Sequence, residues 1–210
     1  MLTISSEPIT LLLVRKIYEW RNIMTTDNNS SSYIRDICYI ALFTALIAVL
    51  AQISIPLPGG VPLTLQTFAV PLAGLVLGAK RGTIATAVYV LLGAVGVPVF
   101  AGFSGGLGIV LGMTGGFIVS FPVMAFLAGL AVKKSVKSPL LWLWLVLGAV
   151  VNYVIGTIWF MVVAGSTLPA ALTACVIPFI PTAIIKIILS GIFGTMLRGV
   201  LVKANLLQIK

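Results

Sequence analysis

Apolar residues fill six stretches of this chain, and each stretch ends at glycine, proline or a charged residue. The stretches lie at 37–53, 65–77, 83–97, 109–132, 140–163 and 174–201. Apolar runs bounded by such signals are typical of helices buried in lipid or in a helical bundle. The pattern predicts an all-α integral membrane protein with six transmembrane helices.

Composition agrees with this pattern. Hydrophobic residues make up 60% of the chain and charged residues only 8%, whereas charged residues make up about 25% of a soluble domain. The net charge of +9 would favour nucleic acid as a partner of a soluble protein. Here the cations sit in short clusters between apolar runs, where they orient a membrane chain. We therefore expect a lipid bilayer as the surroundings and no nucleic-acid partner.

The cationic clusters alternate along the chain. Arg35 precedes the first stretch, Lys80 and Arg81 lie in the second connection, Lys133, Lys134 and Lys137 lie in the fourth, and Arg198, Lys203 and Lys210 follow the sixth. The first, third and fifth connections carry no charge. All clusters thus fall on one side of the membrane, and the positive-inside rule places that side, with both termini, in the cytoplasm.

The first 34 residues differ from the rest. They hold three of the four acids, Glu7, Glu19 and Asp27, and a polar stretch at 25–32. We expect residues 1–34 to form a cytoplasmic leader or linker, and residues 35–210 to form the membrane-embedded domain.

The second and third stretches are short for membrane spans. At about 13 to 15 residues they would measure roughly 20 to 23 Å as helices, against a hydrocarbon thickness near 30 Å. The loops beside them, 54–64 and 98–108, must then enter the depth of the membrane. Irregular backbone is tolerated there only against protein or a water-filled cavity. The lengths predict a cavity that opens to the outside.

Lys186 lies inside the sixth apolar stretch, and the chain has no histidine and no carboxylate after Asp36. A lysine within a membrane segment costs about 2.5 to 3.5 kcal/mol and normally faces a partner, a cavity or a ligand. A helix that begins near Pro181 would place Lys186 in its second turn, close to the positive end of the helix dipole. Lys186 is therefore predicted to bind an anionic small molecule.

Other polar residues are candidates for the same pocket. Asn152 lies near the middle of the fifth stretch, and Gln52, Thr64 and Gln66 flank the first outer loop. A buried amide often serves only as a hydrogen bond between helices, so both interpretations of Asn152 stay open. Apolar walls could come from Phe100, Phe103, Tyr89, Tyr153 and Trp159, and a backbone lining from the glycines at 102–106.

Most enzymatic mechanisms lack their residues in this chain. Without histidine or later carboxylates, a Ser190–Lys186 dyad is the one catalytic arrangement left, and a serine that eases helix packing is the alternative. Cys38 and Cys175 have no metal-ligand spacing, and the glycine-rich run is not followed by the lysine and serine or threonine of a P-loop. We expect no catalysis, metal or cofactor. A stand-alone facilitator or secondary transporter stays open as an alternative function.

Ala41 and Ala45 lie four residues apart on the first helix. Small residues at this spacing let another helix approach closely. That helix could belong to this chain or to a partner protein.

Three longer runs are specific enough to compare with known families. They are VPLTLQTFAVPLAGLVLGAKRG at 61–82, GVPVFAGFSGGLGIVLGMTGGF at 96–117 and PFIPTAIIK at 178–186. These runs resemble the BioY family, the biotin-binding S components of energy-coupling factor (ECF) transporters. The resemblance extends from about residue 37 to the C-terminus.

The resemblance implies a six-helix S-component bundle that captures biotin near the outer face of a bacterial cytoplasmic membrane. A separate transmembrane subunit and two ATPase subunits would power the transport, and Ala41 and Ala45 would contact that transmembrane subunit. Biotin would then be the anionic ligand of Lys186. The residues expected to bind it are Lys186, Asn152, Thr64, Gln66, Phe100, Gly102, Thr182 and Tyr153.

The sequence departs from the family at one position of the third run. The family usually has Pro-Gly-Asp-x-x-Lys, whereas this chain has Ala183 in the place of the aspartate. The aspartate would accept a hydrogen bond from the ureido ring of biotin or balance the charge of the lysine. Asn152 or Thr182 could accept that bond instead.

Overall fold

The computed structural model describes residues 15–16, 33–134, 139–204 and 206–207. Internal contacts divide the chain after Tyr39, and the compact unit that follows runs from Ile40 to Lys210. This unit contains every element from β1 onward and the later turns of the helix Tyr33–Ala51. Most of the predicted leader, and Lys137 and Lys210 among the predicted cations, lie outside the described residues.

The described part of the chain is mostly helical. After Tyr33–Ala51 come α2 (Gln66–Leu77), α3 (Ala79–Ala94), α4 (Leu107–Val110), α5 (Gly115–Lys134), α6 (Leu140–Ala164), α7 (Leu168–Cys175) and α8 (Ile180–Lys203). Short 3-10 turns lie at Ala101–Phe103 and Ile177–Phe179. Strands β1 (Ser54–Ile55) and β2 (Leu63–Thr64) form a small antiparallel hairpin that pairs Ser54 with Thr64.

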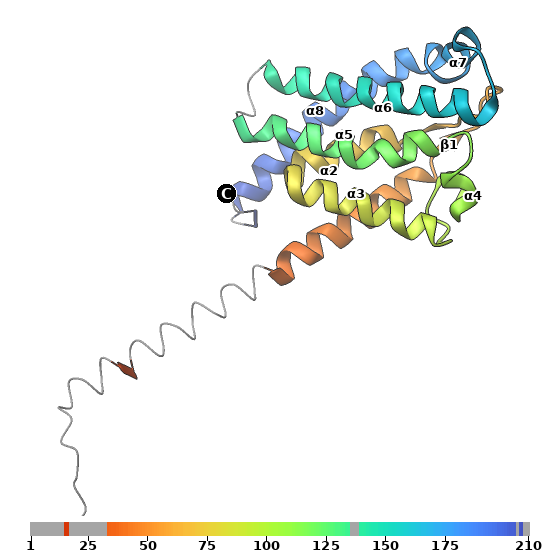
Figure 1. Ribbon diagram of the computed structural model, residues 1–210. Coiled ribbons are helices and arrows are strands. Elements are labelled where there is room, and N and C mark those ends of the chain that lie inside the picture. The colour runs from red at the N-terminus through yellow and green to blue at the C-terminus, as the bar shows by residue number, and fades with distance from the viewer. Residues whose placement is uncertain (1–14, 17–32, 135–138, 205, 208–210) are drawn as a thin grey trace, which may run out of the picture. The chain divides into compact units, whose positions relative to one another are not determined.

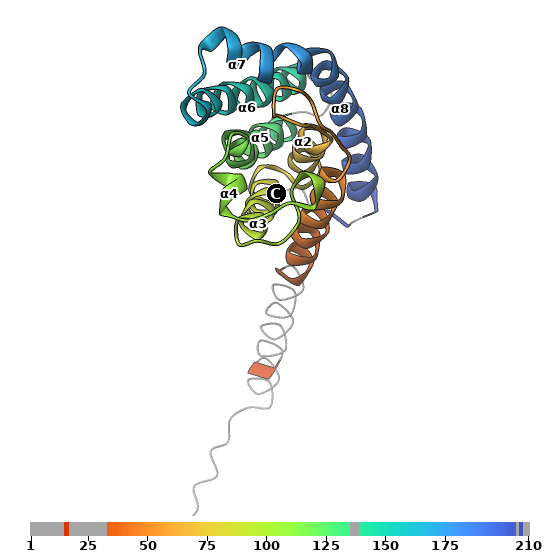
Figure 2. The ribbon, with the colours of Figure 1, turned by 90° about the vertical axis from the view of Figure 1, so that its right-hand side faces the viewer.

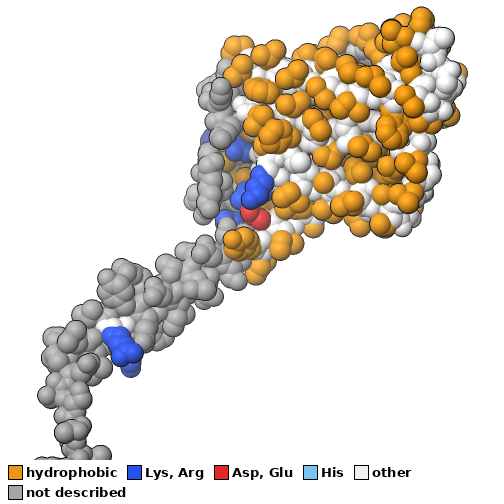
Figure 3. Space-filling model, in the orientation of Figure 1, with side chains coloured by type: hydrophobic (Ala, Val, Ile, Leu, Met, Phe, Trp, Pro, Cys, Tyr) orange, Lys and Arg blue, Asp and Glu red, His pale blue; other side chains and the backbone are white. Residues whose placement is uncertain are grey.

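Four helical stretches of the described residues are long and apolar enough to cross a membrane. They are Tyr33–Ala51, Gly115–Val132, Leu140–Ala164 and Leu168–Lys203, and Gln66–Leu77 is a shorter apolar helix. Large apolar side chains are exposed along these helices. Figure 3 shows hydrophobic side chains spread over the whole visible face of the compact unit, as expected of a surface that contacts lipid. The chain is therefore an all-α, multi-pass membrane protein.

Helix α2 is the centre of the bundle. It packs against α3, α5 and α8, and α5 packs most extensively against α6. Figure 1 shows α3, α5 and α6 side by side, and Figure 2 shows α2 enclosed between α5, α3 and α8. The β hairpin, α4 and α7 gather at one end of the bundle (Figure 1).

The sequence of α2 explains its central place. Residues 69–77 are all buried, and they present apolar or small side chains in every direction. A helix that is apolar all round is stable only when other helices surround it. Gly74 adds a second reason, because its Cα faces α5 and α3 so closely that a Cβ would overlap the backbone of Ala125.

Replacement of Gly74 by alanine is expected to destabilise the bundle. The added Cβ would meet backbone atoms, which cannot rotate away, so we expect a loss of about 1 to 3 kcal/mol, typical of overpacked cores. Thermal unfolding in detergent, followed by tryptophan fluorescence, measures this change. Gly199→Ala is the matched control, since a Cβ at Gly199 meets nothing within 4 Å. Equal melting temperatures of the two variants would contradict the close crossing.

Two of the predicted spans are divided in the structure. The stretch 109–132 is split into α4 and α5, and Gly112 and Gly115 lie at the break. The stretch 174–201 begins later, at Ile180, because a 3-10 turn containing Pro178 separates α7 from α8. The remaining predicted stretches agree with helices to within four residues at each end.

Cationic residues of the compact unit meet at one end of the bundle. The Arg198 side chain on α8 donates a hydrogen bond to the carbonyl of Val76, 2.8 Å away in the last turn of α2. The α2–α3 connection, next to Lys80 and Arg81, therefore lies beside the C-terminal part of α8. The last carbonyls of a helix have no partners within it, and an arginine is well suited to bind them.

Candidate ligand-binding site

A cavity of about 250 Å³ lies among the hairpin, the α3–α4 loop, and helices α2, α5, α6 and α8. It is lined by Gly60, Val61, Pro62, Thr64, Gln66, Thr67, Phe100, Ala101, Ser104, Ile109, Thr114, Phe117, Ile118, Phe121, Asn152, Tyr153, Cys175, Phe179 and Lys186. The two loops at 54–64 and 98–108 both contribute to this lining. The prediction that these two loops border a cavity is therefore confirmed.

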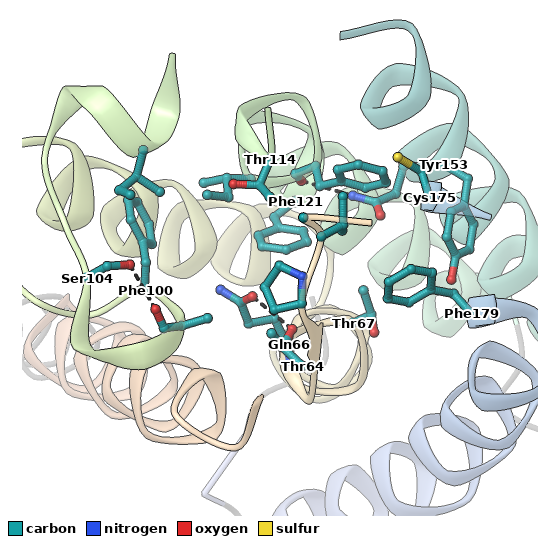
Figure 4. A pocket seen from close by; sticks show the side chains of 18 of the residues that line it. Thr64, Gln66, Thr67, Phe100, Ser104, Thr114, Phe121, Tyr153, Cys175 and Phe179 are labelled. Atoms are coloured by element: carbon teal, nitrogen blue, oxygen red, sulfur yellow. Dashed lines mark hydrogen bonds between the residues drawn. The ribbon is translucent and has the colours of Figure 1, made fainter. Parts of the chain in front are cut away.

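Aromatic rings form much of the wall. Figure 4 shows Phe121 between Phe100 on one side and Tyr153 and Phe179 on the other. Tyr153 also packs edge-to-face with Phe117, with ring centroids 6.4 Å apart. Cavities of this composition bury the apolar body of a small ligand, while a few polar groups fix its orientation.

Lys186 supplies the one cationic group of the lining. It lies in the second turn of α8, as the position of Pro181 predicts, and only 8% of its surface is exposed. Its ammonium group donates hydrogen bonds to the carbonyl of Thr64 at 2.7 Å and to the hydroxyl of Thr67 at 3.2 Å. An ammonium carries three protons. The third has no hydrogen-bond acceptor among the described residues and is available to an anionic ligand group.

Asn152 makes a contact between helices and also lines the cavity. Its amide nitrogen donates to the carbonyl of Phe117 at 3.0 Å and to the hydroxyl of Ser120 at 2.7 Å, which joins α6 to α5. Its carbonyl oxygen has no hydrogen bond among the described residues, and Asn152 lines the cavity. The helix contact thus orients the amide and leaves an acceptor for a ligand.

Thr64 and Gln66 belong to a buried hydrogen-bond chain. The Thr64 hydroxyl donates to Oε1 of Gln66 at 2.9 Å, and the Gln66 amide donates to the hydroxyl of Tyr89. Tyr89 then donates to the carbonyl of Val99 at 3.1 Å, in the α3–α4 loop. Since Lys186 binds the carbonyl of Thr64, one chain of hydrogen bonds connects the buried cation with this loop.

Phe100 is held against two residues of α3. Only 1% of its surface is exposed, its ring packs edge-to-face on Tyr89 with centroids 5.5 Å apart, and it covers Gly93. A Cβ at Gly93 would overlap the Phe100 ring. The glycine therefore makes room for an aromatic residue of the cavity wall.

The Gly93→Ala substitution is expected to move Phe100 into the cavity and to weaken ligand binding roughly 5- to 150-fold, since overpacking costs about 1 to 3 kcal/mol. Equilibrium binding of the ligand proposed below measures the loss. Gly199→Ala, in open surroundings, should bind as the unmodified chain does. An unchanged affinity of Gly93→Ala would mean that the position of Phe100 does not shape the site.

The structure brings together six of the eight predicted binding residues. Lys186, Asn152, Thr64, Gln66, Phe100 and Tyr153 all line the cavity. Gly102 lies outside the lining, in an exposed turn with φ of 67°. Thr182 also lies outside the lining, and its hydroxyl donates to the carbonyl of Phe179 at 2.9 Å.

Other residues that the sequence suggested have different roles. Phe103 is 72% exposed, Tyr89 lies behind Phe100, and Trp159 donates to the carbonyl of Gly112 at 2.9 Å. None of the three lines the cavity. Ser190 is fully buried outside the lining, and its hydroxyl donates to the backbone carbonyl of Lys186 rather than meeting the ammonium group. The serine–lysine dyad is therefore not formed, and the packing role fits.

Several lining residues carry no signal in the sequence. Thr67, Thr114, Phe117, Phe121 and Phe179 resemble many other hydroxyl and aromatic residues of the apolar stretches. Thr67 lies in the first turn of α2, three residues after Thr64, which ends β2. The others depend on how the helices pack.

A second, small cavity adjoins Lys186. Its volume is about 10 Å³, close to what one water molecule needs, and it shares Thr67, Asn152, Tyr153 and Lys186 with the larger cavity. Ala183 completes its wall, one helical turn before Lys186. Ala183, where the sequence departs from Pro-Gly-Asp-x-x-Lys, thus borders a small void beside the Lys186 side chain.

Together, the apolar bundle and a cavity with aromatic walls and one cation define a membrane protein that binds a small molecule. A crystal structure of the S-component for biotin from an ECF-type ABC transporter has the same fold, with a TM-score of 0.74 and 30% sequence identity over 80% of this chain and 93% of that one. The BioY family model matches residues 23–202, and the chain belongs to the BioY family.

Individual relatives agree with this assignment. A probable biotin transporter BioY of Pyrococcus horikoshii is 44% identical over 79% of this chain and 97% of its own length. The biotin transporter BioY of Rhodobacter capsulatus is 38% identical over 75% of this chain and 90% of its own length. The similarity therefore covers nearly the whole of each relative.

Proposed function

We propose that this chain is the S component of an ECF-type importer and binds biotin in the cavity beside Lys186. The observation that carries the proposal is the buried ammonium group, with one proton that has no acceptor among the described residues, in a cavity whose wall includes five aromatic rings. Biotin has the matching chemistry, since it joins a carboxylate to an apolar chain and a compact bicyclic ring. The names of the related proteins and of the similar crystal structure support biotin as the ligand.

Each of the six predicted residues that line the cavity has a role in this proposal. Lys186 pairs with the biotin carboxylate, since a buried cation is costly without a partner. The free carbonyl oxygen of Asn152 accepts from a ureido N–H, and Thr64 and Gln66 hold the lysine and the loop in place. Phe100 and Tyr153 pack on the apolar part of biotin.

The protein is a binding subunit of a transporter and has no catalytic role. The family and the similar crystal structure are those of transport proteins. ATP hydrolysis would come from two partner ATPase subunits, which act through a separate transmembrane subunit. A tilt of the loaded bundle in the membrane would release biotin inward.

We further propose six membrane crossings with both termini in the cytoplasm. The crossings would be Tyr33–Ala51, α2, α3, α5, α6 and α8, with the two short helices completed by the outer loops. The contact between Arg198 and the C-terminal end of α2 supports this orientation, because it brings cations of two segments to one end. Residues 1–34 would be a cytoplasmic leader and 35–210 the binding domain.

Ala41 and Ala45 are proposed to contact the transmembrane subunit. Both are exposed in the compact unit, and their small side chains leave the helix backbone open to close approach. An internal packing role would require them to be buried among helices of this chain.

Uptake of labelled biotin by a biotin-auxotrophic strain tests the proposed function. The chain is expressed alone or with the transmembrane and ATPase subunits of its own organism. We expect efficient accumulation only with those subunits, and none when the ATPases carry an inactivating P-loop substitution. Equal uptake by the chain alone would instead identify a facilitator.

A further inference from the structure

The α3–α4 loop, residues 95–106, separates the cavity from the surroundings of the protein. Phe100, Ala101 and Ser104 line the cavity from this loop. Phe103, three residues after the buried Phe100, is 72% exposed and does not line the cavity. The same short loop therefore contributes both to the cavity lining and to the exposed surface.

This loop contains a strained turn. Phe103 has φ of 54° and is the one non-glycine residue with positive φ in the described part of the chain. The left-handed region is unfavourable for a residue with a Cβ, and a bulky side chain rarely adopts it. Such a conformation persists only where surrounding contacts hold it.

Gln52 supplies the contacts that hold the turn. Its Oε1 accepts a hydrogen bond from the backbone N–H of Phe103 at 2.8 Å. Its Nε2 donates to the carbonyl of Val99 at 3.3 Å and to that of Ala48 at 2.9 Å. One side-chain amide thus binds the loop on both sides of Phe100, although Gln52 itself does not line the cavity.

The carbonyl of Val99 also accepts a hydrogen bond from the hydroxyl of Tyr89, at 3.1 Å. Tyr89 stands at the end of the hydrogen-bond chain that begins at Lys186 and passes through Thr64 and Gln66. The loop is therefore bound from two directions. One contact comes from Gln52, just after the helix Tyr33–Ala51. The other comes through Tyr89 from the hydrogen-bond chain that begins at Lys186.

We propose that Gln52 is a positioning residue that holds the α3–α4 loop closed over the bound ligand and so sets the rate of ligand dissociation. The proposal rests on the proposed function, because biotin is the ligand used to test it. Opening the loop breaks both hydrogen bonds of the Gln52 amide to it and releases the strained turn at Phe103. The amide thus opposes opening, and its loss should act mainly on dissociation rather than on association.

The test measures biotin dissociation from the purified chain, by chasing labelled biotin with an excess of unlabelled biotin. Gln52→Met keeps the shape of the side chain and removes its hydrogen bonds. We expect dissociation roughly three- to tenfold faster, from the usual net worth of lost hydrogen bonds, with association changed less than twofold. Gln52→Glu keeps the acceptor for the N–H of Phe103. Its dissociation rate should lie between those of the unmodified chain and Gln52→Met.

A second substitution separates positioning from general support of the fold. Phe103→Gly makes the left-handed turn easy without the help of Gln52. The double variant Gln52→Met/Phe103→Gly is therefore expected to recover most of the slow dissociation. Gln52→Met/Phe103→Leu, which keeps the strain, should not recover it.

Each outcome bears on one proposal. Unchanged dissociation in Gln52→Met, or equal recovery by glycine and leucine at position 103, would overturn the role of Gln52. Gln52→Met and Gln52→Met/Phe103→Gly could also share a lowered melting temperature and fast dissociation. That result would mean that Gln52 only supports the fold, and it would overturn the proposed positioning role as well. Failure of the unmodified chain to bind biotin would instead overturn the proposed function.

Discussion

Replacement of Lys186 by methionine is expected to weaken biotin binding by about 100-fold, because truncating one partner of a buried, hydrogen-bonded charge pair costs about 2 to 5 kcal/mol. Methionine keeps the length and apolar stem of the lysine. It removes the donor to Thr64 and Thr67 and the cation that would face the ligand carboxylate. Equilibrium titration of each purified variant with biotin measures the loss.

Biotin methyl ester identifies which group of the ligand meets the lysine. The ester should bind the unmodified chain far more weakly than biotin does, whereas the Lys186→Met variant should bind the two ligands alike. Lys186→Arg, which keeps the charge, should retain more of the preference for the acid. If the unmodified chain binds the ester and the acid equally well, Lys186 does not pair with the carboxylate.

Ala41→Trp is expected to abolish assembly with the transmembrane and ATPase subunits and to leave biotin binding intact. Ala41 and Ala45 present a small, exposed surface on the first long helix, and a tryptophan there prevents close approach of a second helix. Co-purification of the subunits measures assembly, and titration of the isolated chain measures biotin binding. The effect should be close to complete, because one large side chain separates the two backbones.

Val162→Trp is the matched control for this substitution. Val162 is 79% exposed on α6 and far from Ala41 in the sequence, so its replacement adds the same bulk to a different helix. We expect normal assembly of Val162→Trp. Normal assembly of Ala41→Trp would show that the partner binds elsewhere, and a parallel loss of biotin binding would show that Ala41 supports the fold.

The long apolar stretches allowed most of the fold to be predicted, because lipid and helix packing both select for the same uninterrupted pattern. The second and fifth stretches agree closely with α2 and α6. The start of α3 was harder to predict, since Lys80 and Arg81 lie in its first turn and hydropathy assigns them to a loop. Helix breaks inside apolar sequence depend on local backbone hydrogen bonds, which hydropathy does not report.

The break before α8 illustrates the same limit. Pro178 lies in the 3-10 turn and Pro181 in the first turn of α8, so the two prolines mark the boundary between α7 and α8. An apolar run with two prolines is compatible with one kinked helix as well as with two helices. Only the packing of α7 on α6 distinguishes these alternatives.

The candidate site was predictable where a residue contradicts its surroundings. Lys186 stands out because a cation within an apolar run is costly to bury, and Asn152 stands out because a polar amide there is also costly. Phe121 and Phe179 do not stand out, since aromatic residues are ordinary in such helices. Their place in the cavity wall follows from helix packing that brings residues distant in sequence together.

Calorimetric titration of the detergent-purified chain with biotin tests the central claim most directly. We predict saturable binding of one biotin per chain, with a negative heat-capacity change because the apolar part of biotin is buried. The titration is done at two temperatures, because a binding enthalpy near zero at one temperature would hide the binding there but not at the other. Absence of saturable binding at both temperatures, in a chain that unfolds cooperatively, would contradict the account.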